Sequence, residues 1–206
     1  MTARRLGLLF VVSAPSGAGK TTLLASLLKE FPDLTYSVSA TTRAPRQGEV
    51  DGRDYHFLSE EEFLRLRDTG HFAEWAEVHG SYYGTPMRPV VDLLSAGKDV
   101  LFDIDVAGAD QLRQVFREAT YVFILPPSRA ELTRRLGSRG TESPKALSRR
   151  LKNAAGEIAQ AGRYDYLVVN DDLHRATDQL RAIYLASRAR PALTPGLVED
   201  ILAQFD

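Results

Sequence analysis

The chain has 206 residues, of which 44% are hydrophobic and 26% are charged, and its formal net charge at pH 7 is −1. This balance is typical of a soluble globular protein and supplies no global positive field for nucleic acid. The absence of cysteine excludes disulfide bonds and thiolate metal sites and is compatible with a reducing compartment. The longest apolar run, residues 6–14, is too short to span a bilayer. We therefore expect one substantial core in a cytoplasmic protein, with neither nucleic acid nor membrane as a partner.

The first predicted elements are a strand over Gly7–Val12 and a helix over Gly19–Phe31, joined by a loop of small residues. Residues 14–21 read APSGAGKT and fit the phosphate-loop pattern G-x-x-x-x-G-K-[ST] except at Ala14. Alanine is small enough for a phosphate to approach, so this departure weakens the pattern but not the mechanism. An ordinary turn with an incidental lysine is the alternative, but the strand and the helix are the context that the motif requires.

Each part of this motif suits a nucleoside triphosphate for a physical reason. Gly17 and Gly19 permit backbone conformations that turn successive N–H groups toward phosphate oxygens, and the N-terminus of the next helix adds its dipole. Lys20 supplies a mobile positive charge for the outer phosphates, and Thr21 supplies a hydroxyl for Mg²⁺. The expected contact residues of this site are Ala14, Pro15, Ser16, Gly17, Ala18, Gly19, Lys20, Thr21 and Thr22.

The middle of the chain is aromatic and rich in turns, with few strand–helix–strand signals. Ser59 and the three glutamates after it indicate a helix start, because serine caps the first turn and acids favour the positive end of the helix dipole. We predict a mixed insertion here. Its expected elements are a strand over Tyr36–Ala40, a basic loop over residues 41–49, a helix after Ser59, strands over Phe72–Val78 and Tyr82–Tyr83, and a helix over Val90–Ala96.

The alternation of strands and helices resumes after residue 97 and predicts an α/β fold, with an open parallel sheet flanked by helices. The expected strands are a buried one over Val100–Val106, one over Tyr121–Leu125 and a last buried one over Tyr166–Val169. The expected helices cover Gln111–Phe116, Ser128–Leu136, Pro144–Ala161 and Arg175–Ser187, followed by a small amphipathic helix over Leu197–Phe205.

Two further groups of polar residues indicate phosphate chemistry. Arg43 and Arg46 lie three residues apart in a proline-containing loop, where their guanidinium groups can converge on one phosphate. A solvated basic turn is the alternative, which the preceding phosphate loop makes less attractive. Asp103 and Asp105 end a buried strand, where open α/β sheets place their ligands.

Taken together, these motifs are similar to those of the guanylate kinase family, in the same order and spacing over residues 6–185. The resemblance rests on Ser16-Gly17-Ala18-Gly19-Lys20, Thr41-Thr42-Arg43-x-Pro45-Arg46-x-Gly48-Glu49, Asp54-Tyr55, Glu74-Trp75-Ala76, Tyr82-Tyr83-Gly84-Thr85, Asp103-Ile104-Asp105, the segment from Arg135 to Glu142, and Asn170-Asp171-Asp172.

The resemblance implies that the insertion binds GMP. Its phosphate would be held by Arg43, Arg46, Tyr55 and Tyr83. Guanine would be read by the carboxylate of Glu74, which faces its N1–H and N2–H₂ donors, and by the hydroxyls of Ser39 and Thr85, which face O6. Adenine reverses this donor and acceptor pattern, so such a site would reject it. Asp105 would lie on the GMP side. Asp103, also counted among the GMP-site residues, would lie near the phosphates and contact Mg²⁺ through water, together with Thr21.

The resemblance also implies a lid, in which Arg135, Arg139 and Arg150 close over the ATP phosphates, and a contact of Asn170 with adenine. Lys20, Arg43 and the three lid arginines would act in catalysis, because phosphoryl transfer asks mainly for positioning and charge stabilisation. The implied single unit over 1–206 has a core in 1–35, 97–125 and 162–190, a GMP-binding insertion in 36–96, a lid in 126–161 and a helical tail in 191–206.

The expected activity is transfer of the γ-phosphate of ATP to GMP, with Mg²⁺ as the cofactor. Two alternatives stay open: a kinase for another phosphorylated acceptor, and a non-catalytic guanylate-kinase-like interaction module. A regulatory GTPase is disfavoured because the sequence contains no Asn-Lys-x-Asp motif. We expect a monomer or homodimer; Leu197, Ile201, Leu202 and Phe205 of the tail would pack on the same chain or on a partner.

Overall fold

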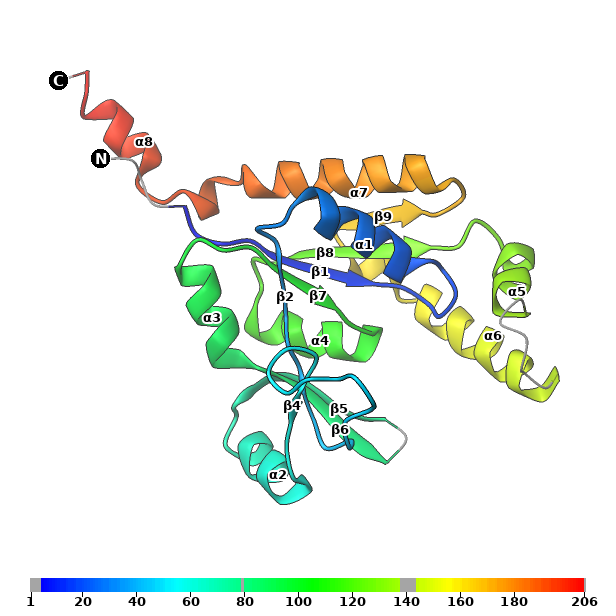
Figure 1. Ribbon diagram of the computed structural model, residues 1–206. Helices are drawn as coiled ribbons and strands as arrows, with labels where there is room; N and C mark the ends of the chain where they lie inside the picture. The colour runs from blue at the N-terminus through cyan, green and yellow to red at the C-terminus, as the bar shows by residue number, and fades with distance from the viewer. Residues whose placement is uncertain (1–4, 79, 138–143, 206) are drawn as a thin grey trace.

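The computed structural model describes residues 5–78, 80–137 and 144–205 and contains a parallel sheet with helices on both faces (Figure 1). This arrangement confirms the predicted α/β class. In spatial order the strands of this core sheet are β2 (Thr35–Tyr36), β7 (Val100–Asp103), β1 (Leu9–Ser13), β8 (Thr120–Leu125) and β9 (Tyr166–Val169), each parallel to its neighbour.

Alternation along β1 divides the core between the two faces of the sheet. Phe10 and Val12 pack with α1 and α7 on one face, whereas Leu9 and Val11 pack with α3 and α4 on the other (Figure 1). Every residue of β1 is buried, as expected for a central strand of a parallel sheet covered on both sides. The bounds of these helices are α1 (Lys20–Glu30), α3 (Met87–Ser95), α4 (Val106–Val115) and α7 (Leu173–Arg188).

A second, mixed sheet forms the insertion and lies below the core in Figure 1. Its small core is built on Phe63, which is fully buried and stacks on Phe72 with ring centroids 4.4 Å apart. The side chain of Gln111 on α4 fastens the insertion to the core by bonding both the N–H and the carbonyl of Trp75, at 3.1 and 2.8 Å. The elements are β4 (His56–Phe57), β3 (Ala40–Thr41), β6 (Ser81–Pro86) and β5 (Phe72–Val78), with helix α2 (Glu60–Asp68).

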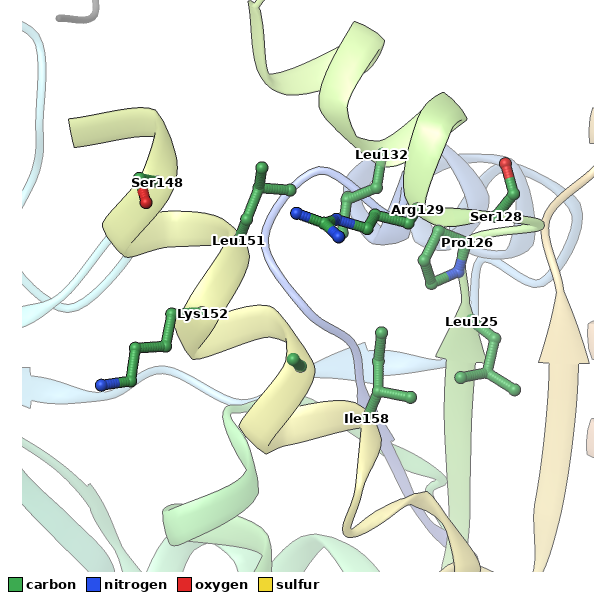
Figure 2. Close-up of a pocket in the computed structure, with 10 residues that line it drawn as sticks. Leu125, Pro126, Ser128, Arg129, Leu132, Ser148, Leu151, Lys152 and Ile158 are labelled. Atoms are coloured by element: carbon green, nitrogen blue, oxygen red, sulfur yellow. The ribbon is translucent and has the colours of Figure 1, made fainter. Parts of the chain in front are cut away.

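Two helices, α5 (Arg129–Gly137) and α6 (Pro144–Ile158), follow β8 and pack against each other through Leu132, Leu136 and Ala154. A cavity of about 460 Å³ lies between them, and Figure 2 shows Leu132, Leu151 and Ile158 pointing into it. No residue predicted to bind a nucleotide lines this cavity. The volume of this cavity therefore does not identify it as the nucleotide site.

The chain ends in a segment that leaves the body of the protein (Figure 1). Short 3₁₀ turns at η1 (Ala161–Arg163) and η2 (Pro191–Leu193) flank β9 and α7, and α8 (Leu197–Leu202) projects beyond them. No residue of α8 is buried. Within the described parts of the chain, we find no helix whose length and apolar character would let it cross a membrane.

The predicted strand over Tyr36–Ala40 is wrong, because the structure divides it between the two sheets. β2 ends at Tyr36 beside β7, and β3 begins at Ala40 in the insertion. The intervening residues cross from one sheet to the other: the N–H of Ser37 still bonds Leu101, whereas the carbonyl of Ser39 already accepts from His56. The alternation of residue types along this segment does not show that its two ends pair in different sheets.

The predicted boundary around residue 105 is also wrong. β7 ends at Asp103 rather than at Val106, and α4 begins at Val106 rather than at Gln111. The reason is a cap: Oδ1 of Asp105 accepts a hydrogen bond of 2.8 Å from the N–H of Gly108.

The last predicted strand, Tyr166–Val169, has the expected bounds but is not buried. Only Val168 is shielded from solvent, because β9 forms an edge of the sheet and α7 covers one face.

Candidate functional site

The phosphate-loop residues lie at the carboxyl end of β1, where β1 passes through a tight loop into α1. Gly17 and Gly19 have φ values of +89° and +94°, which lie in the left-handed region that glycine adopts without strain. Gly19 is the N-cap of α1 and offers no side chain to the first turn of the helix. The N–H groups of that turn are therefore available to an anion.

Gly19 is required for a second reason, which is the close approach of Asn170. A Cβ at position 19 would lie 2.3 Å from Nδ2 of Asn170. This Nδ2 donates a hydrogen bond of 2.7 Å to the carbonyl of Ala18, and Asn170 is only 6% exposed. Asn170, predicted to contact adenine, thus braces the phosphate loop in this structure.

Lys20 connects the phosphate loop to the end of β7. Its ammonium forms an ion pair with Asp103 and donates to the carbonyl of Ile104 at 3.3 Å. Parallel pairing of β7 with β1 sets Asp103 opposite Val12, directly before the loop. The register of the sheet therefore brings these predicted site residues together.

The lid arginines that the structure describes contact the phosphate loop. Arg150 on α6 donates to Oγ of Ser16 at 2.6 Å. Arg135 on α5 donates to the carbonyls of Ala18 and Asn170 at 3.2 and 2.9 Å. Both guanidinium groups thus lie beside the loop expected to bind phosphates.

Glu131 holds Arg135 in place and was not predicted as part of the site. Its Oε1 accepts from Nε of Arg135 at 2.7 Å, one helical turn away on α5. Hydrogen bonds from Arg134 and Arg135 lower the pKa of Glu131 to about 2, so it is an anion at neutral pH. This acid orients one of the predicted catalytic arginines.

The three residues predicted to read a guanine base form one hydrogen-bonded chain. The hydroxyl of Thr85 donates to Oε1 of Glu74 at 2.6 Å, and the hydroxyls of Ser39 and Thr85 lie 3.2 Å apart. Glu74 is 8% exposed and Thr85 is 2% exposed. Burial raises the pKa of Glu74, and the nearby charge of Asp105 raises it further, whereas the bond from Thr85 lowers it.

A β-bulge explains how an acid on β5 comes to be buried. Phe72, Ala73 and Glu74 are consecutive and all buried, although side chains of a regular strand alternate between faces. The register shifts between Phe72 and Glu74, so that Glu74 faces Thr85 on β6. Bulges of this kind re-aim a side chain, and here the side chain is the carboxylate that was predicted to select the base.

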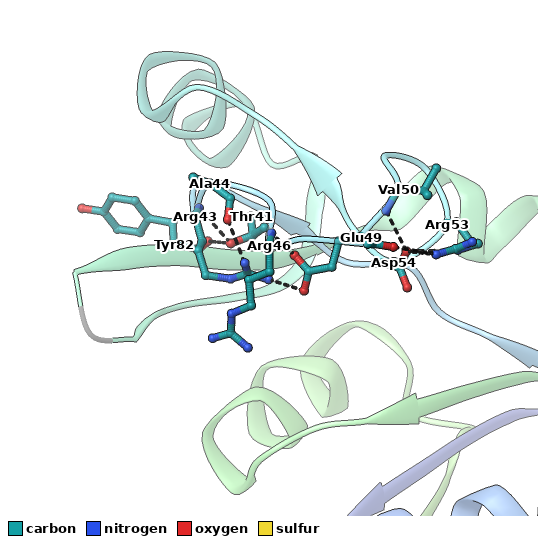
Figure 3. A network of polar contacts seen from close by, with 10 residues as sticks. Thr41, Arg43, Ala44, Arg46, Glu49, Val50, Arg53, Asp54 and Tyr82 are labelled. Carbon is teal, nitrogen blue, oxygen red and sulfur yellow. Dashed lines mark hydrogen bonds and ion pairs between the residues drawn. The ribbon is translucent and has the colours of Figure 1, made fainter.

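The predicted phosphate-binding cluster is assembled around Arg43. Its guanidinium lies 5.4 Å from the centroid of the Tyr55 ring, and the Tyr55 and Tyr83 rings are 6.1 Å apart. Glu49 accepts a bond of 2.9 Å from Arg43 and one of 2.7 Å from the backbone N–H of Arg46 (Figure 3). These bonds lower the pKa of Glu49, and the side chain of Arg46 is exposed.

Asp105 links the two halves of the site. It lines a cleft of about 360 Å³ together with the phosphate-loop residues, including Lys20 and Thr21. Burial is the main cause of the raised pKa of Glu74, and the charge of Asp105 adds to it. The predicted ATP-site residues around α1 and the predicted GMP-site residue Glu74 are thus both near the start of α4.

Sequence comparison decides the family. A family model described as guanylate kinase matches residues 7–187. This chain belongs to the guanylate kinase family. The guanylate kinases of Nitratidesulfovibrio vulgaris and Oleidesulfovibrio alaskensis are each 55% identical to it, over 202 and 205 residues; the matches cover 98% of both chains for the first and 100% of both for the second. The crystal structure of guanylate kinase from Anaplasma phagocytophilum matches with a TM-score of 0.76 at 36% identity, covering 100% of this chain and 98% of that one.

One residue of this guanylate kinase that sequence reasoning missed is Glu157. It is half-buried on α6 and lines the phosphate-loop cleft with Lys20, and it lines a second cavity of about 500 Å³ with Ser16 and Arg150. Burial, followed by the charge of Asp105, raises the pKa of Glu157. Its spacing of seven residues from Arg150 was the available signal, because positions i and i+7 share a helix face.

Two predictions for the site concern the lid residue Arg139 and the Mg²⁺ ion. Arg139 lies outside the described residues. Within those residues, no group of three or more His, Cys, Asp or Glu side chains could hold a metal ion. The predicted Mg²⁺ contacts are both oxygen donors: Thr21 follows Lys20 in sequence and Asp103 is ion-paired with it, which fits a cation bound chiefly by phosphates and water.

Proposed function

We propose that this member of the guanylate kinase family transfers the γ-phosphate of ATP to GMP, giving ADP and GDP. The observation that carries the proposal is the hydrogen-bonded chain of Ser39 and the buried residues Thr85 and Glu74, in a protein that also has a phosphate loop. A phosphate loop alone indicates only that a triphosphate binds. The hydrogen-bonded residues Glu74, Thr85 and Ser39 distinguish guanine from other bases.

Guanine recognition follows from the donor and acceptor pattern of this chain. Thr85 already donates to Oε1 of Glu74, so the remaining capacity of the carboxylate can accept from N1–H and N2–H₂ of guanine. The hydroxyl of Ser39 lies 3.2 Å from that of Thr85, and its single proton turns from Thr85 to O6 when guanine binds. Adenine would set the lone pair of its N1 against the carboxylate, and a buried polar group without a partner costs about 1–3 kcal/mol.

In the proposed reaction an oxygen of the GMP phosphate attacks the γ-phosphorus, while the bond from that phosphorus to the β-phosphate oxygen breaks. Lys20, Arg135 and Arg150 stabilise the charge on the transferring group and on the departing ADP. Arg43 exchanges its bond with Glu49 for the GMP phosphate, which Arg46, Tyr55 and Tyr83 also bind. No covalent intermediate with the protein is formed.

We propose Mg²⁺ as the cofactor, with Thr21 as a direct ligand and Asp103 acting through water. When bound with ATP, the ion supplies charge neutralisation between the phosphates. Asp103 also forms an ion pair with Lys20, which holds the ammonium at the carboxyl end of β7 before the substrates arrive. The proposed contacts of ATP with residues 14–22 and Asn170, and of Arg139 with its phosphates, complete the donor site.

The division of labour within the chain is part of the same proposal. Residues 1–35, 97–125 and 162–190 form the nucleotide-binding core, residues 36–96 bind GMP, residues 126–161 act as the lid, and residues 191–206 form the tail. We further propose that the enzyme serves purine nucleotide metabolism in the cytoplasm, without nucleic acid or membrane as a partner.

Calorimetric titration tests the base-reading assignment directly. GMP should bind the wild type far more tightly than AMP, and Glu74→Ala should lose most of this difference while ATP affinity stays within about twofold. Glu77→Ala, on the same strand but exposed, is the matched control and should leave both affinities unchanged. Equal losses of GMP and ATP binding in Glu74→Ala would refute the assignment.

A further inference from the structure

An amide side chain of the core pairs with the edge of the insertion sheet. β5 is an edge strand of that sheet, and an edge strand presents a row of backbone groups that no neighbouring strand can pair. At Trp75 the side chain of Gln111 on α4 takes this place: its Oε1 accepts from the backbone N–H at 3.1 Å, and its Nε2 donates to the carbonyl at 2.8 Å. A primary amide carries both an acceptor and donors, so Gln111 pairs with Trp75 much as a neighbouring strand would.

These two bonds act on the backbone of the residue that we propose reads the base. Glu74 directly precedes Trp75, and the N–H of Trp75 belongs to the planar peptide unit that begins at Cα of Glu74. A bond that holds this N–H therefore holds one side of the Glu74 backbone. On the other side, Ala73 is buried in an apolar cluster that includes Ala109 of α4. The backbone of Glu74 is thus held on both sides by contacts with one helix.

The same helix also approaches the carboxylate of Glu74. Gly108 lies three residues before Gln111, which places the two residues on one face of α4. A Cβ at Gly108 would lie 3.3 Å from Oε2 of Glu74, closer than most such contacts. At the start of α4, Asp105 accepts from the N–H of Gly108 at 2.8 Å and lines the phosphate-loop cleft. One helix therefore joins the cleft proposed to bind ATP to the acid proposed to read GMP.

We propose that Gln111 is a positioning residue for guanine selection, an inference that rests on the function proposed above. Its bonds to Trp75 hold the backbone from which the Glu74 carboxylate extends at a fixed place relative to α4 and the phosphate-loop cleft. Gln111 acts through Glu74 rather than on the base. Without these bonds the edge of β5 loosens and the carboxylate samples other positions, so the site distinguishes guanine from adenine less sharply.

Gln111→Met tests this role, because methionine is similar in length and helix propensity but has no amide group. KM for GMP should rise about tenfold, the effect expected from the loss of ordinary hydrogen bonds, and the ratio of kcat/KM for GMP to that for AMP should fall by a similar factor. KM for ATP and kcat at saturating GMP should stay close to the wild-type values. Gln114→Met, at an exposed position of the same helix, is the matched control and should behave like the wild type.

Trp75 supplies a readout that needs no substrate, because it is the single tryptophan of the chain. Time-resolved fluorescence anisotropy of the ligand-free enzyme should show an added fast local motion of Trp75 in Gln111→Met but not in Gln114→Met. Gln111→Ala removes the same two bonds with a smaller side chain and should reproduce both the kinetic and the fluorescence changes.

A Gln111→Met enzyme with the wild-type ratio of GMP to AMP activity would overturn the proposal, and so would unchanged motion of Trp75. Equal rises in KM for GMP and ATP would also overturn it, because they would indicate general disruption rather than positioning of the base-reading acid. No preference for GMP in the wild type would instead contradict the proposed function, so the two failures are distinguishable.

Discussion

The hydroxyl of Thr85 donates a hydrogen bond of 2.6 Å to Oε1 of Glu74, and both side chains are buried. This bond fixes the position of one carboxylate oxygen of Glu74. It also compensates part of the cost of burying a charge. The acid that we propose to read the base is thus a buried acid of the insertion, and its hydrogen-bond partner comes from the neighbouring strand.

Thr85→Val should raise KM for GMP by about 10- to 100-fold, because it leaves the buried carboxylate without its donor at a cost of about 1–3 kcal/mol. KM for ATP should change less than twofold. Thr85→Ser keeps the hydroxyl and should restore most of the GMP affinity. A similar rise in both KM values for Thr85→Val would instead indicate general disruption of the site.

Glu74→Gln should change how stability depends on pH. Burial raises the pKa of Glu74 in the folded state, so the folded protein holds this proton more firmly than the unfolded chain. The resulting stabilisation is fully present below the ordinary pKa of 4.5 and is lost as pH rises through the folded pKa. Glutamine does not titrate, so the variant does not lose stability in this way as the pH rises. Urea unfolding should therefore show the variant gaining on the wild type from pH 4 to pH 7; a constant difference would contradict the account.

How far the site could be predicted depends on whether its geometry is local. The phosphate loop could be predicted from the sequence because its glycines, Lys20 and the adjoining strand and helix are contiguous. The bulge that turns Glu74 inward could not be predicted, since alternation along a strand predicts that neighbouring side chains face opposite ways. Glu157 lies far along the chain from the loop it faces, and only its spacing from Arg150 hinted at this. The split of Tyr36–Ala40 between two sheets depends on pairing partners that the segment itself does not encode.

Gly19→Ala should weaken ATP binding at least tenfold. The new Cβ meets Nδ2 of Asn170, and φ of +94° costs an alanine about 1–2 kcal/mol. Gly156→Ala is a matched control on α6, where a Cβ meets nothing within 4 Å. That change should leave ATP affinity unchanged and stabilise the fold by about 0.5–1 kcal/mol, because alanine favours helix. Calorimetry with ATP and urea unfolding separate the two effects.

Lys20→Met should reduce kcat by about 100- to 1,000-fold, the usual effect of removing one donor to the transition state. GMP affinity should remain close to that of the wild type, because Lys20 contacts Asp103 and Ile104 rather than the predicted base-reading residues. Lys29→Met, at the exposed end of the same helix, should have normal kcat. Comparable loss of turnover and of GMP binding would count against the role proposed for Lys20.

The central claim is that the hydrogen-bonded chain of Ser39, Thr85 and Glu74 makes GMP the acceptor. Steady-state kcat/KM with ATP as donor and GMP, AMP, CMP or UMP as acceptor tests it most directly. We predict that GMP exceeds each of the other three by several orders of magnitude, since a site built to hydrogen-bond one base leaves buried groups unpaired with another. A kcat/KM for AMP, CMP or UMP equal to or above that for GMP would contradict the account.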